Sequence, residues 1–508
     1  MTPSQTPPLP ETLSDALRDA APDQELIIDG DVRLDAETLR ERATALARTL
    51  LTRFPQRGVV SLMLPNWHEA AVVYLGATLA GMAVNPILPS LRDHELSFIL
   101  DDVDSRIIFV PGEFRGHDYA AMLTRVVATL PAPPEVVVVR GPGHTPYESL
   151  FAPDTDVAFP DLDPGDVRMI MYTSGTTGRP KGVLHTHDSL HALIGQLRDN
   201  WHIDPADRFL VPSPIAHIGG SIYAFECPLL LGTTAVLMEQ WEPDAAVALM
   251  TGQRCTHMAG ATPFLAGLLD AAQRAGTRLP DLKVFICGGA SVPPSLIRTA
   301  TDYFDKAIVT RVYGSTEVPV TTVGSPQPGD TDHAADTDGQ PGIADVRLVD
   351  GEIRARGPQM LTGYLHEGKP AAAFDADGYF CTGDLGAWVD EHYLVVTGRA
   401  KDLIIRNGEN IAPKEIEDLL ITEPNIADIA IVGVPDARTG ERACAVIVPG
   451  DGTRADVDQL RRVLADHGVA KFKAPEEVAI WDALPKNDAG KVLKHRIRAQ
   501  LMEERACQ

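Results

Sequence analysis

Short apolar runs alternate with helical patterns of apolar and polar residues along most of the chain. Val59 to Leu64 and Val167 to Tyr172 are runs of strand length, and further runs lie at 107–110, 136–139, 284–287 and 308–312. Helical patterns lie between them, from about Trp67 to Gly81, from about Ser189, and after Pro293-Pro294, where proline suits a first helical turn. This alternation predicts an α/β fold with layered, mainly parallel sheets.

The pattern changes near Val346. Short strands between Gly and Asp turns, at 346–349, 352–355 and 393–396, predict a small β-rich subdomain. After Gly398-Arg399, helical patterns at 413–420 and 457–467 accompany strands at 429–434 and 444–448. We therefore predict a large N-terminal domain over residues 1–398 and a small α+β C-terminal domain over residues 399–508.

Length and charge restrict the classes of function. A chain of 508 residues is too long for one core, and its net charge of -25 argues against nucleic acid and anionic membrane surfaces as main partners. A polyanionic ligand must then be met by locally placed Lys and Arg. The longest apolar stretch, Ala70 to Val84, is too short to span a bilayer, so we expect a core helix and no integral membrane segment.

The cysteines and the N-terminus indicate the compartment. The six cysteines are scattered and form no CxxC pair, which is typical of reduced cysteines in a cytoplasmic protein. Residues 1–10 are rich in Pro and lack the basic and apolar regions of a signal peptide, so we expect a mobile tail there. The sequence predicts a cytoplasmic location.

The most informative stretch is Thr173-Ser174-Gly175-Thr176-Thr177-Gly178-Arg179-Pro180-Lys181-Gly182. Small residues let backbone N–H groups and hydroxyls approach phosphate oxygens, and Lys181 adds a point charge. A Walker loop needs Gly directly before the Lys, and Pro180 stands there instead. Pro180 removes a donor and stiffens the loop, which favours a flap over phosphates rather than a cradle at a helix start.

Other polar strings follow predicted strands. Tyr313-Gly314-Ser315-Thr316-Glu317 offers an aromatic ring for a base, hydroxyls for a phosphate and a carboxylate for Mg²⁺. Gly288-Gly289-Ala290-Ser291 ends another strand, where small residues let a flat ring lie against the backbone. At the carboxyl end of a strand in an open α/β sheet, such strings favour a ligand site.

The ten residues from Thr173 to Gly182, in the order in which they occur, resemble the phosphate loop of the adenylate-forming enzymes. These enzymes comprise acyl-CoA synthetases, nonribosomal peptide adenylation domains and luciferases. The resemblance extends from about Leu26 to Leu501 with the other motifs in order. It implies that ATP is bound, with catalytic roles for Lys181, Thr316 and Glu317 and with Mg²⁺ held by Glu317 and Thr176. The implied nucleotide-contacting residues are Thr173, Ser174, Gly175, Thr176, Thr177, Gly178, Gly289, Ala290, Ser291, Tyr313, Gly314 and Ser315.

Two motifs near residue 400 resemble the family's ribose turn and hinge. In Thr382-Gly383-Asp384 the resemblance implies that Asp384 accepts bonds from both ribose hydroxyls. It also implies that Arg399 binds ribose or phosphate and that Asp402 is the hinge of a mobile C-terminal domain. A loop of Asn407, Gly408 and Glu409 would line a tunnel for coenzyme A.

The string Leu484-Pro485-Lys486-Asn487-Asp488-Ala489-Gly490-Lys491 resembles the family's catalytic-lysine loop. The resemblance implies that Lys491 bridges the attacking carboxylate and the α-phosphate.

The acid site is expected around Pro214 to Gly220. This segment resembles the wall of the family's acyl pocket, with His217 as a wall or gate and not a base. The substrate-contacting residues implied are His217, Ile218, Gly219, Gly220, Pro263 and Gly288. We expect Gly219 and Gly220 to leave room for a bulky ring or a medium chain. Residues 64–67, 85–88 and 110–112 are similar to those of cyclohexanecarboxylate-CoA ligases and related medium-chain enzymes.

The resemblance implies an ATP-dependent carboxylic acid–CoA ligase that uses ATP, Mg²⁺ and coenzyme A. An acyl adenylate forms with release of pyrophosphate, and a thioester then forms with release of AMP. Alternatives are transfer to a carrier-protein phosphopantetheine, a luciferase-like oxidase, and a nucleotide-binding protein without turnover. The complete set of Lys181, Glu317, Asp384, Arg399 and Lys491 argues against the last. The oligomeric state stays open, with a homodimer among the options.

Overall fold

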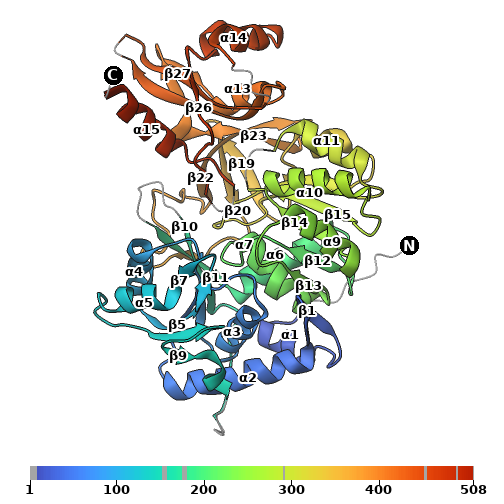
Figure 1. Cartoon of the computed structure of the whole chain (residues 1–508), viewed down its shortest axis with the longest axis vertical. Helices are drawn as coiled ribbons and strands as arrows, with labels where there is room; N and C mark the ends of the chain where they lie inside the picture. The colour runs from blue at the N-terminus through green and yellow to red at the C-terminus, as the bar shows by residue number, and fades with distance from the viewer. Residues whose placement is uncertain are drawn as a thin grey trace.

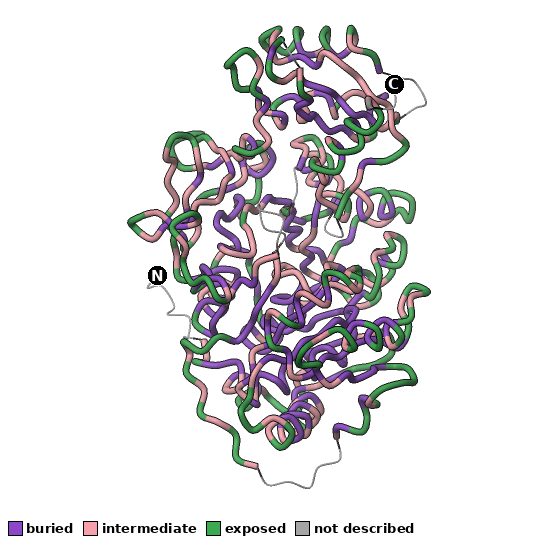
Figure 2. Tube along the Cα trace, turned by 90° about the vertical axis from the view of Figure 1, so that its left-hand side faces the viewer, coloured by how far each residue is buried: buried purple, intermediate pink, exposed green. Residues whose placement is uncertain are grey.

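The computed structural model describes residues 9–151, 157–173, 180–289, 292–436, 438–450, 455–487 and 490–506. A large N-terminal domain and a small C-terminal α+β domain are stacked along the long axis, with the C-terminal domain at the top of Figure 1. Burial is concentrated inside the larger domain, as the tube in Figure 2 shows. The predicted α/β class with mainly parallel sheets is confirmed.

The first large sheet has the spatial order β18-β17-β16-β15-β14-β12-β13-β1-β2. Strands β16, β15, β14, β12, β13 and β1 are parallel to their neighbours in that order, and the outer strands are antiparallel. Its strands are β1 (Glu25–Asp29), β2 (Val32–Asp35), β12 (Arg208–Val211), β13 (Thr234–Leu237), β14 (His257–Gly260), β15 (Val284–Gly288), β16 (Ile308–Tyr313), β17 (Thr322–Val323) and β18 (Gln340–Pro341).

The second large sheet has the order β21-β11-β10-β4-β3-β5-β8-β9. It is parallel from β10 to β9, while β11 and β21 join it antiparallel. Its strands are β3 (Val59–Leu62), β4 (Ala83–Pro86), β5 (Ser105–Pro111), β8 (Glu135–Val139), β9 (Thr145–Pro146), β10 (Val167–Thr173), β11 (Lys181–Thr186) and β21 (Gly363–Tyr364). A separate hairpin joins β6 (Glu113–Phe114) and β7 (His117–Asp118).

Helix α3 (His68–Leu79) lies between the two large sheets. It contacts β3 and β4 of one sheet and β1 of the other, and the side chains from Glu69 to Thr78 are all buried. A helix that is apolar all round is expected in such a position because every face meets protein. The predicted core helix is confirmed, although Ala83 and Val84 at the end of the apolar stretch belong to β4.

The remaining helices of the larger domain cover the sheets or fill the space between them (Figure 1). They are α1 (Leu13–Asp19), α2 (Ala36–Arg53), α4 (Asp93–Asp102), α5 (Tyr119–Val127), η1 (Tyr147–Phe151), α6 (His187–Asn200), α7 (Ile218–Ser221), the π-helix η2 (Ile222–Glu226), α8 (Cys227–Leu231), α9 (Pro243–Gln253), α10 (Thr262–Ala275), α11 (Pro294–Tyr303) and α12 (Thr331–Asp336). Within the described residues, no helix is long and apolar enough to cross a membrane.

A small antiparallel sheet follows, as the sequence predicts. Its order is β19 (Asp345–Val349), β20 (Glu352–Arg356), β22 (Phe380–Val389) and β23 (Tyr393–Arg399). Thr382 to Asp384 was expected to be a turn, but these residues lie inside β22. The strand accommodates them because Gly383 has a φ of 70° and the register with β23 shifts after Leu385.

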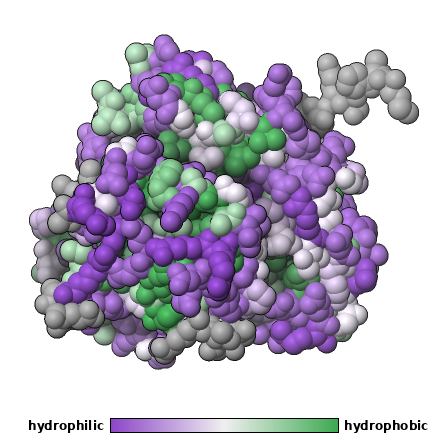
Figure 3. All heavy atoms as spheres, turned by 90° about the horizontal axis from the view of Figure 1, so that it is seen from above, coloured by the Kyte–Doolittle hydropathy of each residue, from purple (hydrophilic) through white to green (hydrophobic). Residues whose placement is uncertain are grey.

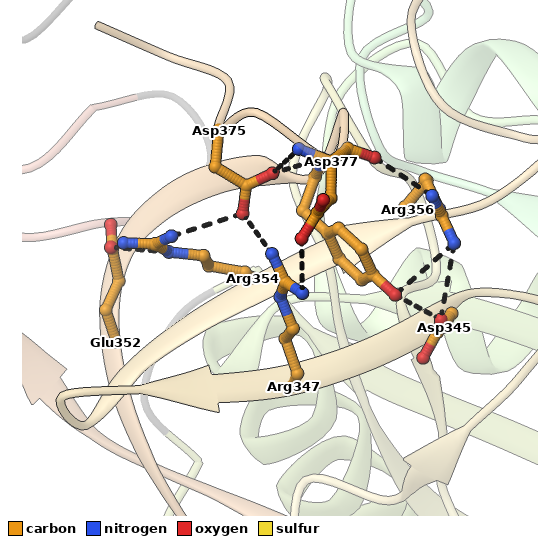
Figure 4. A network of polar contacts seen from close by, with 8 residues as sticks. Asp345, Arg347, Glu352, Arg354, Arg356, Asp375 and Asp377 are labelled. Carbon is orange, nitrogen blue, oxygen red and sulfur yellow. Dashed lines mark hydrogen bonds and ion pairs between the residues drawn. The ribbon is translucent and has the colours of Figure 1, made fainter.

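A polar network fastens the segment before β22 to this sheet (Figure 4). Arg347 pairs with Asp375 at 2.5 Å and with Asp377 at 3.0 Å, and Arg354 pairs with Asp375 at 3.1 Å. The Arg347 guanidinium also lies 3.9 Å from the centre of the Tyr379 ring. The network therefore fixes the start of β22, the strand that carries Asp384.

The C-terminal domain is built on a sheet with the order β25-β24-β27-β26, in which β28 also pairs with β27. Its elements are η3 (Ala400–Asp402), β24 (Ile404–Arg406), β25 (Glu409–Ile411), α13 (Pro413–Leu420), β26 (Ile426–Asp436), β27 (Gly440–Pro449), α14 (Val457–Asp466), η4 (Lys471–Lys473), β28 (Glu477–Ile480) and α15 (Lys494–Ala506). It has its own apolar core around Ile416, Ile431 and Leu460. Seen from this end, the surface is largely hydrophilic with separate hydrophobic patches (Figure 3).

Candidate active site at the junction of the two domains

An apolar cavity of about 310 Å³ opens beyond the carboxyl ends of β14, β15 and β16. These strands are parallel neighbours, so the residues that follow them converge on one place, the usual position of a ligand in an open α/β sheet. Its wall is mostly apolar and includes Trp201, Ile222, Tyr223, Phe264, Ile286 and Val320. Such a cavity suits the hydrocarbon part of a small molecule.

A polar pocket of about 220 Å³ lies between the domains. The larger domain contributes Tyr313, Asp338 and Asp384, while the C-terminal domain contributes the charged residues Lys414, Glu417, Lys491 and Lys494. The pocket and the apolar cavity share Gly289, Val312, Gly314 and Lys491. One ligand can therefore place a charged part in the pocket and an apolar part in the cavity, with Lys491 at the joint.

Asp384 is held by two partners at the wall of the polar pocket. It faces Arg399 across the β22–β23 pair, with Nε of Arg399 2.8 Å from Oδ1, and it accepts a hydrogen bond from the Tyr313 hydroxyl at 2.9 Å. Burial and the nearby carboxylate raise the pKa of Tyr313, so the phenol stays a neutral donor. The predicted residues Tyr313, Asp384 and Arg399 are thus brought together in one hydrogen-bonded group.

Glu317 forms a second group with hydroxyls. Its Oε1 lies 3.1 Å from the Tyr364 hydroxyl and 3.5 Å from Oγ1 of Thr173, which ends β10. Both hydroxyls donate to the carboxylate. Oxygen donors of this kind suit Mg²⁺, so the residues present fit that metal.

Lys181 stands beside this group. Its Nζ lies 2.8 Å from Glu367 and 5.0 Å from the centre of the Tyr364 ring. Lys181 was predicted to belong to a loop, but it is the first residue of β11, antiparallel to β10. The strand therefore fixes the backbone of Lys181, and Glu367 holds its ammonium group.

Lys491 projects from a short turn of the C-terminal domain. Its backbone N–H donates to Oδ1 of Asn487 at 2.8 Å, and Gly490 adopts a φ of 76°, which favours glycine. Burial, together with the nearby positive charge of Arg399, lowers the pKa of Lys491 to about 8. The lysine is therefore charged at neutral pH and becomes neutral in mildly alkaline solution.

His185 supports the segment that carries Thr316 and Glu317. Its Nε2 lies 2.7 Å from the carbonyl oxygen of Thr316, and burial lowers the pKa of His185 to about 4. The imidazole is therefore neutral and donates to the carbonyl. Sequence reasoning missed this residue, as it missed Asp338, Tyr364 and Glu367, because a single His, Asp, Tyr or Glu without a motif carries no specific signal.

The glycines of the acid site behave differently from one another. A Cβ on Gly219 would meet nothing within 4 Å, and Gly219 lines the cavity as expected. A Cβ on Gly220 would lie 2.2 Å from the carbonyl oxygen of Pro214, so the expectation that Gly220 leaves room is wrong. A Cβ on Gly288 would likewise lie 2.4 Å from Cγ1 of Val312, although Gly288 also lines the cavity.

Other predicted residues line the site or lie beside it. His217, Ile218, Ser315 and Thr316 line the apolar cavity, and Asp402 lines the polar pocket. Pro263 lies beside the lysine turn, where its Cγ would be 3.1 Å from a Cβ on Gly490. It lies outside the lining of both cavities.

One group of predicted residues lies apart from the two cavities, and a second group falls outside the described residues. Asn407, Gly408 and Glu409 belong to the β24–β25 hairpin, outside the walls of both cavities. Positive φ angles at Asn407 and Gly408 are typical of a tight two-residue hairpin turn. Residues 174–178, 290 and 291 lie outside the described residues.

Two family models match the chain. The model for the AMP-binding enzyme covers residues 16–365, and the model for the AMP-binding enzyme C-terminal domain covers residues 415–491.

Curated relatives and solved structures match the chain over nearly its whole length. A medium-chain fatty-acid–CoA ligase of Escherichia coli (strain K12) is 31% identical and covers 95% of this chain and 88% of its own. A Mycobacterium tuberculosis CoA ligase for a methyl-dioxo-octahydroindenyl propanoate is 34% identical, and the match covers 94% of this chain and 96% of the relative. The crystal structure of ATP-bound MatB from Rhodopseudomonas palustris has a TM-score of 0.86 at 29% identity, and the match covers 96% of this chain and 98% of MatB.

Proposed function

The chain belongs to the AMP-binding enzyme family and is an AMP-forming acid–CoA ligase by family, and we propose that it activates a medium-chain or alicyclic monocarboxylic acid and transfers the acyl group to coenzyme A. The observation that carries this proposal is the meeting of a polar pocket and an apolar cavity at Lys491. An acyl adenylate has this division, with a charged nucleotide half and an apolar acyl half.

In the first step the residues of the pocket counter repulsion between two anions. The carboxylate is already ionised at neutral pH, so no general base is needed. Lys491 at the joint offers its charge to both the carboxylate and the α-phosphate, while Lys181 offers its charge to the outer phosphates. Mg²⁺ would be held by Glu317 and would supply further charge neutralisation there. Asp384 would accept bonds from the ribose hydroxyls.

In the second step the C-terminal domain would turn about Asp402. Residues 1–398 and 399–508 would be the two moving parts, joined after β23 by η3. The turn would remove Lys491 and bring the hairpin of Asn407, Gly408 and Glu409 to the acyl group. Such rotation between half-reactions is a gating step.

A third cavity would give the thiol of coenzyme A a route to the acyl carbon. It measures about 210 Å³, shares Pro214 and Phe264 with the apolar cavity and is also lined by Arg92 and Arg115. Guanidinium groups bind phosphates well, so we propose that these arginines receive the phosphates of coenzyme A while its thiol reaches past Phe264.

The acid is inferred from the cavity and the relatives. A cavity of about 310 Å³ with open space at Gly219 suits a ring or a medium chain. The names of the two relatives, a medium-chain fatty acid ligase and a ligase for a bicyclic propanoate, support the same range. Cyclohexanecarboxylate and related alicyclic acids are therefore the first substrates to try.

The test is a panel of acids scored for acid-dependent pyrophosphate and AMP release with ATP, Mg²⁺ and coenzyme A. We expect release with alicyclic and medium-chain acids, together with a thioester product. Replacing coenzyme A by a phosphopantetheinylated carrier protein should give no acylated carrier. Acylation of the carrier but not of coenzyme A would contradict the proposed acceptor, and absence of release with every acid would contradict the proposed activity.

A further inference from the structure

His185 contacts the backbone beside Glu317, the carboxylate proposed to hold Mg²⁺. Its Nε2 lies 2.7 Å from the carbonyl oxygen of Thr316, and the side chain is fully buried. Burial lowers the pKa of this ring to about 4, so it is neutral, and Nε2 carries the proton because a carbonyl oxygen only accepts. On the other side of the ring, Nδ1 lies 3.3 Å from Oγ of Ser189. Polar contacts at both nitrogens therefore fix the orientation of the imidazole.

The backbone of Glu317 depends on bonds of this kind because it lies in a bend after β16, outside the helices and strands. The carbonyl that His185 binds belongs to the peptide group between Thr316 and Glu317, so the imidazole fixes the peptide before Glu317. The peptide after Glu317 is fixed by the backbone N–H of Leu361, which donates to the Glu317 carbonyl at 2.8 Å. Of these two bonds, the first depends on a side chain and can be removed by substitution.

The same bond joins Glu317 to the strand that carries Lys181. His185 and Lys181 both belong to β11, and β21 pairs with this strand. Tyr364 of β21 donates its hydroxyl to the Glu317 carboxylate at 3.1 Å. Strand β11 therefore supports Glu317 by two routes, directly through His185 and indirectly through β21. The ammonium group of Lys181 and the carboxylate of Glu317 are thus both positioned relative to one strand.

We propose that His185 is a positioning residue for the metal–nucleotide site. By its bond to the Thr316 carbonyl it holds Glu317 in place, and it thereby sets the affinity for the metal-bound triphosphate. The inference rests on the proposed function, in which Glu317 holds Mg²⁺ and Lys181 contacts the outer phosphates. His185 lines neither the polar pocket nor the apolar cavity, so its effect passes through the backbone of Glu317. Partners that orient a metal ligand in this way commonly change metal affinity by roughly tenfold to a hundredfold when they are replaced.

The test measures nucleotide binding without turnover, in the absence of any acid. Kd is measured by calorimetry for Mn²⁺–ATP and for AMP, with the natural enzyme and with His185→Leu, and electron paramagnetic resonance of Mn²⁺ reports the bound metal directly. We expect the Kd for Mn²⁺–ATP to rise roughly tenfold in the variant, because the carboxylate of Glu317 is no longer held in place. The Kd for AMP should stay unchanged, because AMP lacks the outer phosphates and the metal bound to them.

Matched variants separate positioning from a general loss of stability. His185→Gln keeps an N–H donor at about the reach of Nε2 and should recover most of the affinity for Mn²⁺–ATP. His185→Asn is one methylene shorter than Gln and should lose affinity as His185→Leu does, which keeps the test available if His185→Leu does not fold. The control is His257→Leu, because His257 is also fully buried with its Nε2 2.9 Å from a backbone carbonyl, that of Trp201. It should lower the melting temperature similarly and leave the Kd for Mn²⁺–ATP unchanged.

Glu317→Gln distinguishes failure of the inference from failure of the proposed function. It should raise the Kd for Mn²⁺–ATP at least as much as His185→Leu does. If Glu317→Gln weakens binding but the folded His185 variants do not, or if His185→Leu weakens AMP binding equally, the inference is overturned and the proposed function stands. An equal loss in His257→Leu would also overturn it. If Glu317→Gln leaves the Kd for Mn²⁺–ATP unchanged, the proposed role of Glu317 is wrong, and the inference falls with it.

Discussion

The polar pocket and the apolar cavity differ in how the chain builds them, although they meet at Lys491. The pocket is formed across two domains by charged residues that pair with one another, such as Asp384 with Arg399 at 2.8 Å. The cavity is lined mainly by the larger domain, with uncharged residues from many separate elements. The pocket is thus specified by a few charges and the cavity by shape. Substitutions in the polar pocket should therefore change KM for ATP, and substitutions in the apolar cavity should change which acid is preferred.

Lys491 belongs to both regions, because it lines the polar pocket and the apolar cavity. We expect Lys491→Ala to lower the rate of acyl-adenylate formation by about 100-fold or more, since a preorganised charge at the reacting atoms is lost. Thioester formation from supplied acyl adenylate should be largely retained. The control is Lys486→Ala. Lys486 lies on the same loop as Lys491, but its ammonium group is paired with Asp428 of β26. Equal loss of both half-reactions in Lys491→Ala would contradict its role in the first step alone.

Asp384→Asn tests the polar side. The substitution removes the charge that Arg399 and the Tyr313 hydroxyl share, so KM for ATP should rise roughly tenfold to a hundredfold, as loss of charged hydrogen bonds predicts. The order of preference among acids should not change. Asp377→Asn, an exposed carboxylate of the neighbouring network in Figure 4, is the matched control and should leave KM for ATP as it is. A changed acid preference in Asp384→Asn would show that the two regions are not separable.

Two adjacent glycines test the apolar side. Gly219→Val fills open space, so kcat/KM for ring acids should fall roughly tenfold relative to short acids. Gly220→Ala instead places a Cβ against the Pro214 carbonyl, so the protein should lose about 1–3 kcal/mol of stability, measured as a lower melting temperature. If Gly219→Val lowers activity on all acids equally, the cavity is not the acyl site.

The pH dependence of adenylation is the smallest expected effect, and it tests whether Lys491 acts in its charged form. Its pKa of about 8 means that the charged form is lost as the pH rises through that value, so kcat/KM for adenylation should fall on the alkaline side of pH 8. The positive charge of Lys401 contributes to the lowered pKa, so Lys401→Gln should move the alkaline limb slightly upward. A downward shift, or none, would argue against Lys491 as the titrating group.

Much of the fold followed from local patterns. The apolar runs predicted β3, β5, β8 and β10 of one large sheet and β15 and β16 of the other, and the continuous apolar segment predicted α3, because strand length and burial on all sides leave a signal within a short window. The strand character of Thr382 to Asp384 did not follow, because Thr-Gly-Asp is typical of turns and only the bulge against β23 reveals the strand. Lys181 was missed as a strand residue because its loop composition hid the pairing with β10.

The sequence by itself determined the polar motifs, their order and the reaction class that they imply, because charged groups in short strings carry their chemistry with them. Only the tertiary structure decided which residues meet. It placed the Tyr313 hydroxyl on Asp384, the His185 ring on the carbonyl of Thr316, and Tyr223 and Trp201 in the wall of the apolar cavity. It also separated Gly219, which faces open space, from Gly220, which packs against backbone. The shape of the cavity arises from contacts between residues far apart in the chain. The fold, rather than any one motif, therefore determines which acid fits.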